Sequence, residues 1–186
     1  MSLPARARAT YDDLCRVPDH LVAELLDGEL VTSPRPAPRH ANAASGIGGD
    51  LHTPFQRGRG GPGGWWILDE PELHLGGDVV VPDVAGWRVE RLGELPTTAY
   101  FELSPDWICE VLSPATAALD RATKLPLYAR EQVDHAWLVD PAARTLEIFQ
   151  RHGNQWVLLA VHRDHQVVRA PPFAAIELEL AGWWAP

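Results

Sequence analysis

Three segments within residues 79–128 determine the fold that we expect: VVVPDV (79–84), WICEVL (107–112) and LDRATKLPLY (119–128). The first two are short, apolar, rich in β-branched residues and bounded by turn formers, which is typical of buried strands. The third has a helical pattern that contains a proline. We therefore expect two adjacent buried strands and a helix that follows them.

Each of the two predicted strands carries one carboxylate. Alternation along a strand places Asp83 and Glu110 on faces that are otherwise apolar. An unpaired buried carboxylate is costly and takes up a proton unless something offsets its charge. A divalent cation shared by the two groups would do so, and a nearby ammonium would help. The third segment supplies Lys124, the only lysine in the chain.

Length and composition predict a single domain over residues 11–186 that follows a tail of residues 1–10. The chain has 186 residues, and 46% of them are hydrophobic, which suits a globular protein with a sizeable core. No apolar run approaches the roughly 18 residues of a membrane span, and the N-terminus lacks the apolar core of a signal peptide. Cys15 and Cys109 suggest no disulfide framework. We expect a cytoplasmic protein that has no membrane partner.

The formal net charge of −9 limits the expected affinity for nucleic acids. Non-specific DNA binding depends largely on lysine and arginine side chains that neutralise phosphates. An acidic chain needs a local basic patch, metal ions or oligomerisation to bind DNA. The charge argues against avid DNA binding, but it does not argue against a nuclease.

The N-terminal half is expected to combine helices and hairpins. The predicted elements are a helix from Tyr11 to about Pro18, a hairpin over 21–31 that turns at Asp27-Gly28, a helix over roughly 40–56 and a strand over 65–68. Residues 58–63 (GRGGPG) match a dinucleotide-binding fingerprint in letters only, because no strand precedes them. We expect a loop there.

The C-terminal half is expected to be mainly β-structure. Residues 72–75 should turn at Gly76-Gly77 into the strand that carries Asp83, and a helix kinked or delayed by Pro126 should follow Glu110. Further predictions are a strand over 135–140 paired with 145–149, a hairpin between 156–162 and 166–169, and a tryptophan pair at 183–184 that lies in the core or at a subunit contact.

Each candidate site residue also has a purely structural interpretation. Asp83 follows a proline and could simply form a turn, and Glu110 could form a buried salt bridge with an arginine. Lys124 lies four residues after Asp120, the favoured order for an ion pair on a helix surface. However, the chain has fifteen arginines and one lysine, and a retained lysine suggests a need for a compact ammonium.

Taken together, these residues resemble the PD-(D/E)XK nuclease superfamily and, within it, the restriction-endonuclease-like Uma family, also called domain of unknown function 820. The stretches that carry the resemblance are 23–30, 33–40, 81–83, 110–114, 124–130 and 136–141. The resemblance implies an α/β (α+β) fold with a restriction-endonuclease-like core. In this core helices flank a mixed central β-sheet, to which antiparallel hairpins are added.

The resemblance also implies roles for individual residues. Asp83 and Glu110 would bind the metal ion, and Lys124 would steer or activate water. The superfamily's lysine usually stands two residues after the glutamate, where this chain has Leu112, so Lys124 would have to reach the site from the following helix. Glu24 and His40 are accessory candidates that would complete the surroundings of the metal.

Two functions are consistent with these residues. The first is an endonuclease that hydrolyses DNA phosphodiester bonds with Mg²⁺, for which Mn²⁺ could substitute, because Mg²⁺ prefers oxygen ligands. The second is a nuclease-fold protein with weak or no catalysis that acts as a nucleic-acid-binding or interaction module. A homodimer is expected, because symmetric cleavage of a duplex needs two sites and the tryptophan pair at 183–184 offers a contact.

Overall fold

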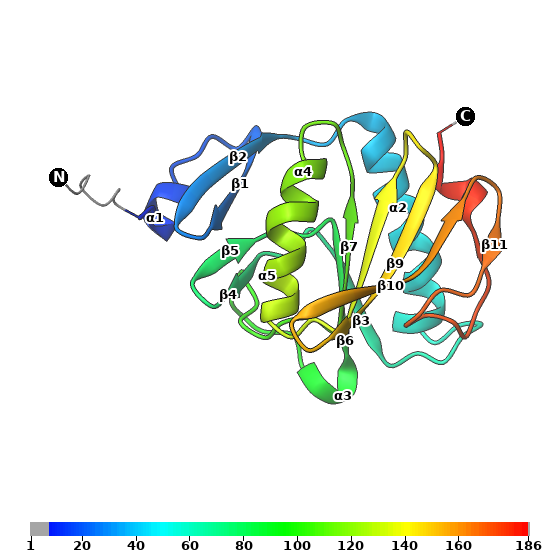
Figure 1. The fold of residues 1–186 in the computed structure, drawn as a ribbon. Coiled ribbons are helices and arrows are strands. Elements are labelled where there is room, and N and C mark those ends of the chain that lie inside the picture. The colour runs from blue at the N-terminus through cyan, green and yellow to red at the C-terminus, as the bar shows by residue number, and fades with distance from the viewer. Residues whose placement is uncertain (1–7, 186) are drawn as a thin grey trace.

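The computed structural model describes residues 8–185, which form two main sheets, a two-stranded sheet and several helices (Figure 1). The elements in chain order are α1 (Tyr11–Leu14), β1 (Leu21–Leu26), β2 (Glu29–Pro34), α2 (Pro38–Leu51), the π-helix η1 (His52–Gln56), β3 (Trp65–Asp69), β4 (Leu73–Leu75), β5 (Asp78–Val80), β6 (Val84–Arg88), α3 (Val89–Leu92), β7 (Trp107–Val111), α4 (Ala117–Leu119), the π-helix η2 (Asp120–Lys124), α5 (Leu125–Arg130), β8 (His135–Asp140), β9 (Thr145–His152), β10 (Gln155–Arg163), β11 (Val167–Val168), β12 (Leu178–Glu179) and the 3₁₀-helix η3 (Leu180–Trp183).

The larger sheet has the strand order β10-β9-β8-β7-β6-β3. Strands β7 and β8 pair in parallel, and the other neighbours pair antiparallel. The sheet is therefore mixed, which confirms the predicted mixed central sheet. All five residues of β7 are buried, because helices cover both faces of the sheet at its centre, and this double burial explains the nearly continuous apolar sequence.

Alternation along β7 divides its side chains between two cores. Trp107, Cys109 and Val111 pack on the side of α2, together with the C-terminal residues. Ile108 and Leu112 pack on the side of α5. Figure 1 shows α2 on one side of the sheet and the α4–α5 helix on the other. Alternation predicts that Glu110 shares a face with Ile108 and Leu112, and it therefore points toward α4–α5.

The smaller main sheet has the order β2-β1-β5-β4. It confirms the hairpin that turns at Asp27-Gly28 and the hairpin that turns at Gly76-Gly77. One prediction is wrong: residues 79–84 do not form a single strand. Strand β5 ends at Val80, and β6 starts at Val84 in the other sheet. Pro82 has no N–H group for a ladder hydrogen bond, so Val81-Pro82-Asp83 connects the two sheets.

The helix that follows Glu110 accommodates Pro126 without a break in the helical run. A π-turn, η2, joins α4 to α5, and the N–H of Leu125 donates to the carbonyl of Asp120. Pro126 then lies in the first turn of α5, where its missing N–H is tolerated. At the C-terminal end Gln132 adopts a left-handed φ of 67°, a conformation that glycine usually supplies where a helix ends.

The C-terminal pairing differs from the prediction. Residues 155–163 form one long strand paired with β9, and β11 pairs with β12, so the expected hairpin between 156–162 and 166–169 is wrong. Trp183 and Trp184 are 0% and 6% exposed and belong to the α2-side core. Because both are buried within the chain, they provide no surface for a subunit contact.

Other expectations agree with the structure or lie partly outside it. Residues 57–64 form an irregular loop between η1 and β3, and both cysteines are free. Within residues 8–185, no helix is long and apolar enough to cross a membrane. Residues 1–7 of the expected tail lie outside the described residues. The N–H of Ala9 donates to the carbonyl of Gly28 at 2.9 Å.

Candidate functional site

The strand register brings Asp83 and Glu110 to the same place. In the antiparallel β6–β7 pair, Val84 lies opposite Cys109. Asp83 precedes Val84 and Glu110 follows Cys109, so continuing the register by one residue places the two carboxylates side by side. One oxygen of Asp83, Oδ2, accepts a hydrogen bond from the N–H of Val111 at 2.7 Å. Asp83 therefore does more than form a turn, because its side chain accepts a hydrogen bond from the backbone of the neighbouring strand.

His40 contacts Asp83 from the opposite side. It lies in the first turn of α2, and its Nε2 is 3.2 Å from Asp83 Oδ1. Burial lowers the pKa of His40, and the Asp83 carboxylate more than reverses this, so the net direction is upward. Its Nδ1 atom is buried and has no hydrogen-bond partner among the described residues. A proton on His40 would be shared with Asp83 through Nε2.

Lys124 is buried and bridges three protein acceptors. Its Nζ lies 2.8 Å from Glu110 Oε1, 3.0 Å from Glu24 Oε1 and 3.1 Å from the Val81 carbonyl. The side chain is 4% exposed, so the interpretation as an ion pair on a helix surface is wrong. Asp120 Oδ1 is more distant, at 3.9 Å. An ammonium has three N–H donors, and these acceptors can use all of them.

Glu24 and Lys124 together hold the connection between the two sheets. The N–H of Val81 donates a hydrogen bond to Glu24 Oε1 at 2.9 Å. The carbonyl of Val81 accepts a hydrogen bond from Lys124 Nζ. Both polar groups of Val81 are therefore fixed immediately before Pro82 and Asp83. This arrangement explains how Asp83 is positioned although it lies outside a regular strand.

Glu110 receives two donors on one oxygen. The Tyr128 hydroxyl donates to Oε1 at 2.6 Å, and Lys124 contacts the same atom. The interpretation as a buried pair with an arginine is wrong, since the cation is Lys124. Burial raises the pKa of Glu110, and the Lys124 ammonium acts in the opposite direction. The surrounding carboxylates raise the pKa of Lys124 against the effect of its burial, so we take the lysine as charged.

Tyr128 is the contact that sequence reasoning missed. Its ring is completely buried in the α5-side core, and in the sequence it reads as one more apolar residue on a helix. Its spacing could have predicted the contact, because a residue four positions after Lys124 lies on the same side of a helix. Burial and the neighbouring Glu110 raise the pKa of Tyr128, so its hydroxyl keeps the proton that it donates.

Asp120 is a third buried carboxylate close to Lys124. Its side chain is 4% exposed. Burial raises the pKa of Asp120 to about 6, although Lys124 and a hydrogen bond with Thr116 oppose this change. The π-turn η2 supplies both Asp120 and Lys124 to the site, and π-turns are frequent at functional sites.

The Asp120 side chain should make stability depend on pH in a defined direction. Its pKa is higher in the folded chain than the usual 3.8, so the folded state binds more protons between about pH 4 and 6. The contribution of this group therefore favours folding below about pH 4 and is lost as the pH rises to 6. The loss is at most about 1.4 kcal/mol per pH unit.

Asp120→Asn should remove this dependence. The unfolding free energy of the variant, measured by urea denaturation, should rise relative to that of the wild type between pH 4 and 6 and stay level above pH 7. Asp134→Asn, at an exposed carboxylate, is the control. A difference that does not change across this pH window would contradict the assignment.

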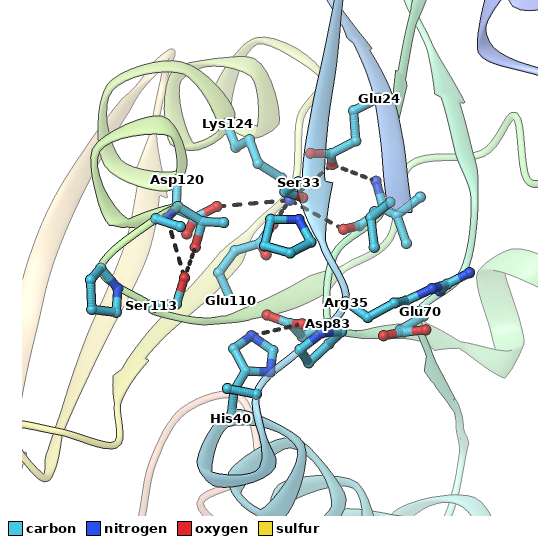
Figure 2. A pocket seen from close by; sticks show the side chains of 18 residues that line it. Glu24, Ser33, Arg35, His40, Glu70, Asp83, Glu110, Ser113, Asp120 and Lys124 are labelled. Carbon is cyan, nitrogen blue, oxygen red and sulfur yellow. Dashed lines mark hydrogen bonds and ion pairs between the residues drawn. The ribbon is translucent and has the colours of Figure 1, made fainter. Parts of the chain in front are cut away.

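All five residues predicted from the sequence line one cavity of about 290 Å³ (Figure 2). They are Glu24, His40, Asp83, Glu110 and Lys124, and Asp120 joins them. Figure 2 shows His40, from α2, below Asp83, and it shows Lys124 and Asp120, from η2, above Asp83. Residues 33–37, which comprise the end of β2 and the segment that follows it, form another part of the wall.

The donor set fits a hard divalent cation that keeps part of its water shell. Four carboxyl groups, from Glu24, Asp83, Glu110 and Asp120, line the cavity, and the single ammonium of Lys124 lies near three of them, so acidic groups are in excess. Within residues 8–185, no three His, Cys, Asp or Glu side chains form a ready metal cluster. Mg²⁺ is commonly held by one or two carboxylates together with waters and substrate phosphates. Asp83 and Glu110 match that mode better than a cage made only of protein ligands.

Comparison with known proteins identifies a family and a fold. The model of a family described as "Uma2: Putative restriction endonuclease" matches residues 8–181. The structure of "a putative nuclease belonging to DUF820 from Anabaena variabilis ATCC 29413" matches 94% of this chain and 98% of its own, with a TM-score of 0.76 and 21% identity. No curated protein matches.

The solved structure shows the fold, and it confirms the restriction-endonuclease-like core expected from the sequence. The family match extends from before α1 to η3 and so includes every residue of the cavity described above. The resemblance drawn from the sequence is therefore confirmed, and the chain belongs to the Uma2 family.

Proposed function

We propose that this protein is a metal-dependent endonuclease that hydrolyses DNA phosphodiester bonds. The observation that carries the proposal is the meeting of Asp83 and Glu110 on neighbouring strands, beside a buried Lys124, in one accessible cavity. Family membership supports the reaction class. The requirement for Mg²⁺, with Mn²⁺ as a substitute, rests on the oxygen donors and on the excess negative charge.

In this proposal Asp83 and Glu110 hold the cation. When bound, it would polarise the scissile phosphate and lower the pKa of an attacking water. Lys124 and Tyr128 both contact Oε1 of Glu110, which leaves Oε2 for the metal. Val111 fixes Oδ2 of Asp83, and His40 lies beside Oδ1. These contacts support the roles of metal ligand for the two carboxylates and accessory residue for His40.

The contacts of Lys124 support a positioning role. Its three donors can be satisfied by Glu110, Glu24 and the Val81 carbonyl, which leaves none directed at a water. We therefore assign to Lys124 and Glu24 the task of holding Glu110 and the segment before Asp83, rather than the steering of water that the resemblance implied. Lys124 also offsets part of the negative charge until a cation arrives.

Tyr128→Phe tests how Glu110 is held. The change removes one donor from Glu110 with almost no change in shape, so metal affinity should fall about 10–100-fold. Direct Mn²⁺ binding without DNA, followed by electron paramagnetic resonance, measures this fall. Tyr11→Phe is the matched control, since that hydroxyl bonds Glu72 at 2.8 Å outside the cavity. Equal affinity in Tyr128→Phe and the wild type would exclude the role.

The experiment that tests the function is nicking of supercoiled plasmid by the purified chain. We expect nicked and linear products with Mg²⁺ or Mn²⁺ and none with a chelator. A parallel assay with labelled single-stranded RNA tests the choice of DNA as substrate. Intact plasmid after prolonged incubation with both metals would reject the proposal.

The formal charge of −9 favours the second function, a nuclease-fold binding or interaction module. Fluorescence anisotropy with a labelled duplex, with and without Mg²⁺, distinguishes the two. Binding without cleavage supports the module. Cleavage that requires metal supports the enzyme.

A further inference from the structure

One cationic side chain at the main cavity has no role in the site described above. Three residues that line this cavity can carry a positive charge, and they are His40, Lys124 and Arg35. Nε2 of His40 lies beside Asp83, and its Nδ1 atom is buried. The three donors of Lys124 have acceptors on the protein. Arg35 is the lining cation that remains to be accounted for.

The contacts of Arg35 leave one edge of its guanidinium free. Its Nε and Nη2 atoms donate to the carbonyl of Asp19 at 3.2 and 2.8 Å. Among the described residues, no carboxylate forms an ion pair with Arg35. A guanidinium carries five N–H donors in a fixed fork, so the edge formed by Nη1 and Nη2 keeps donors that no described residue accepts. Such an edge binds two phosphate oxygens at once.

The sequence around Arg35 holds this side chain at the cavity. Pro34 and Pro36 flank it, and each proline fixes its own φ and favours an extended residue before it. The backbone therefore has few alternatives at this point, and the bonds to Asp19 restrict the side chain further. Arg35 is exposed to solvent, and Figure 2 shows it beside Glu70 on the wall of the cavity. Its free edge can thus meet a ligand that enters the cavity from solvent.

The charge of the cavity indicates which ligand needs this edge. Acidic groups outnumber cationic groups in the lining, and the chain has a net charge of −9, so a nucleic-acid phosphate is repelled unless a cation offsets its charge. A metal ion at Asp83 and Glu110 would offset the phosphate that is cut. The phosphates on either side would still need a donor, and an arginine with a free bidentate edge is well suited to bind them.

We propose that Arg35 binds a phosphate of the DNA strand that neighbours the phosphate being hydrolysed. The contact holds the strand across the cavity and supplies affinity that the acidic surface otherwise lacks. This inference rests on the proposed function, because it takes DNA as the ligand. Its first test measures binding alone, so the absence of this contact and the absence of cleavage give different results.

The first test counts phosphate contacts through the salt dependence of binding. Fluorescence anisotropy with a labelled duplex is measured at several NaCl concentrations, without divalent metal, so that no strand is cut. Arg35→Gln should weaken binding about 10–100-fold. It should also make the slope of log K against log salt shallower by about 0.9, the value for one lost phosphate contact. Arg35→Lys keeps the charge and should keep the slope, but without the bidentate fork it should bind more weakly than the wild type.

Arg169→Gln is the matched control for this test. Arg169 also donates to backbone carbonyls, those of Ala174 and Ala175 at 3.2 and 3.1 Å, and it lies outside the cavity. The affinity and slope of this variant should equal those of the wild type. An unchanged slope in Arg35→Gln, an equal loss in the control, or a wild type that does not bind the duplex would overturn the proposal.

The second test uses the proposed reaction. In plasmid nicking with Mg²⁺, Arg35→Gln should raise KM about 10–100-fold and leave kcat within a few-fold, because the contact is the same before and during the reaction. Mn²⁺ binding without DNA should match that of the wild type, since Arg35 bonds to Asp19 and to no proposed metal ligand. A fall in kcat at unchanged KM, or in Mn²⁺ affinity, would overturn the assignment. A wild type that binds DNA through Arg35 without cleaving it would reject the proposed reaction and support the phosphate contact.

Discussion

Replacing Lys124 by methionine should lower the free energy of unfolding by about 3–5 kcal/mol, the range for a buried ion pair that loses one partner. Methionine nearly matches the volume of the lysine stem, so the loss comes from charge and hydrogen bonding. Glu24, Glu110 and Asp120 would keep their burial and lose the cation that offsets them. Urea denaturation at pH 7 measures the change.

Arg121→Met is the matched control for this prediction, because Arg121 lies on the same π-turn. Its ion pair with Glu147 is partly exposed, at 42% for the arginine side chain, and should contribute less than about 1 kcal/mol. The cost of Lys124→Met should also shrink at low pH, where the buried carboxyls take up protons. A stability equal to that of the control would show that the cluster does not need its cation.

Asp83→Asn should leave the fold intact and reduce plasmid nicking by about a hundredfold or more, the scale seen when one preorganised group is lost. Asparagine can still accept the hydrogen bond from Val111 through its amide oxygen. The change removes the negative charge that would hold the cation beside Glu110. Initial nicking rates with saturating Mg²⁺, normalised to folded protein, measure the loss.

Asp69→Asn provides a control at a nearby carboxylate, since Asp69 borders the adjoining hollow beside His40 but not the main cavity. Its nicking rate should stay within a few-fold of the wild type. If Asp83→Asn cleaves as fast as the wild type, the assignment of Asp83 as a metal ligand fails. Equal melting temperatures of the two variants would show that a loss of nicking does not come from unfolding.

Local sequence signals identified the residues that line the cavity better than they predicted the sheets. Asp83, Glu110 and Lys124 could be found because charged groups in apolar segments need an explanation. Asp-Gly and Gly-Gly turns placed two hairpins correctly, since the turn and both strands lie within a short stretch. The error over residues 79–84 arose because an apolar run does not reveal where a chain leaves one sheet for another.

Two other errors have a similar cause. Strand β10 looked like half of a hairpin with residues 166–169, whereas its partner is the preceding strand β9. Both choices satisfy alternation, and only packing decides between them. Tyr128 could not be distinguished from an ordinary core residue, because only its hydroxyl group, which donates to Glu110, sets it apart from one.

The connection between the two sheets at Val81 makes the cavity sensitive to motions smaller than unfolding. Glu24 lies on β1 of the four-stranded sheet and Glu110 on β7 of the six-stranded sheet, while Val81 lies between the two sheets and Lys124 on η2. A small separation of the β1–β2 hairpin would release Glu24, free one donor of Lys124 and loosen the segment before Asp83, with the tryptophan-rich core unchanged. The proposed nicking activity should therefore be lost at a lower temperature than the core packing, and a crosslink between the β1–β2 hairpin and η2 should raise the temperature at which that activity is lost.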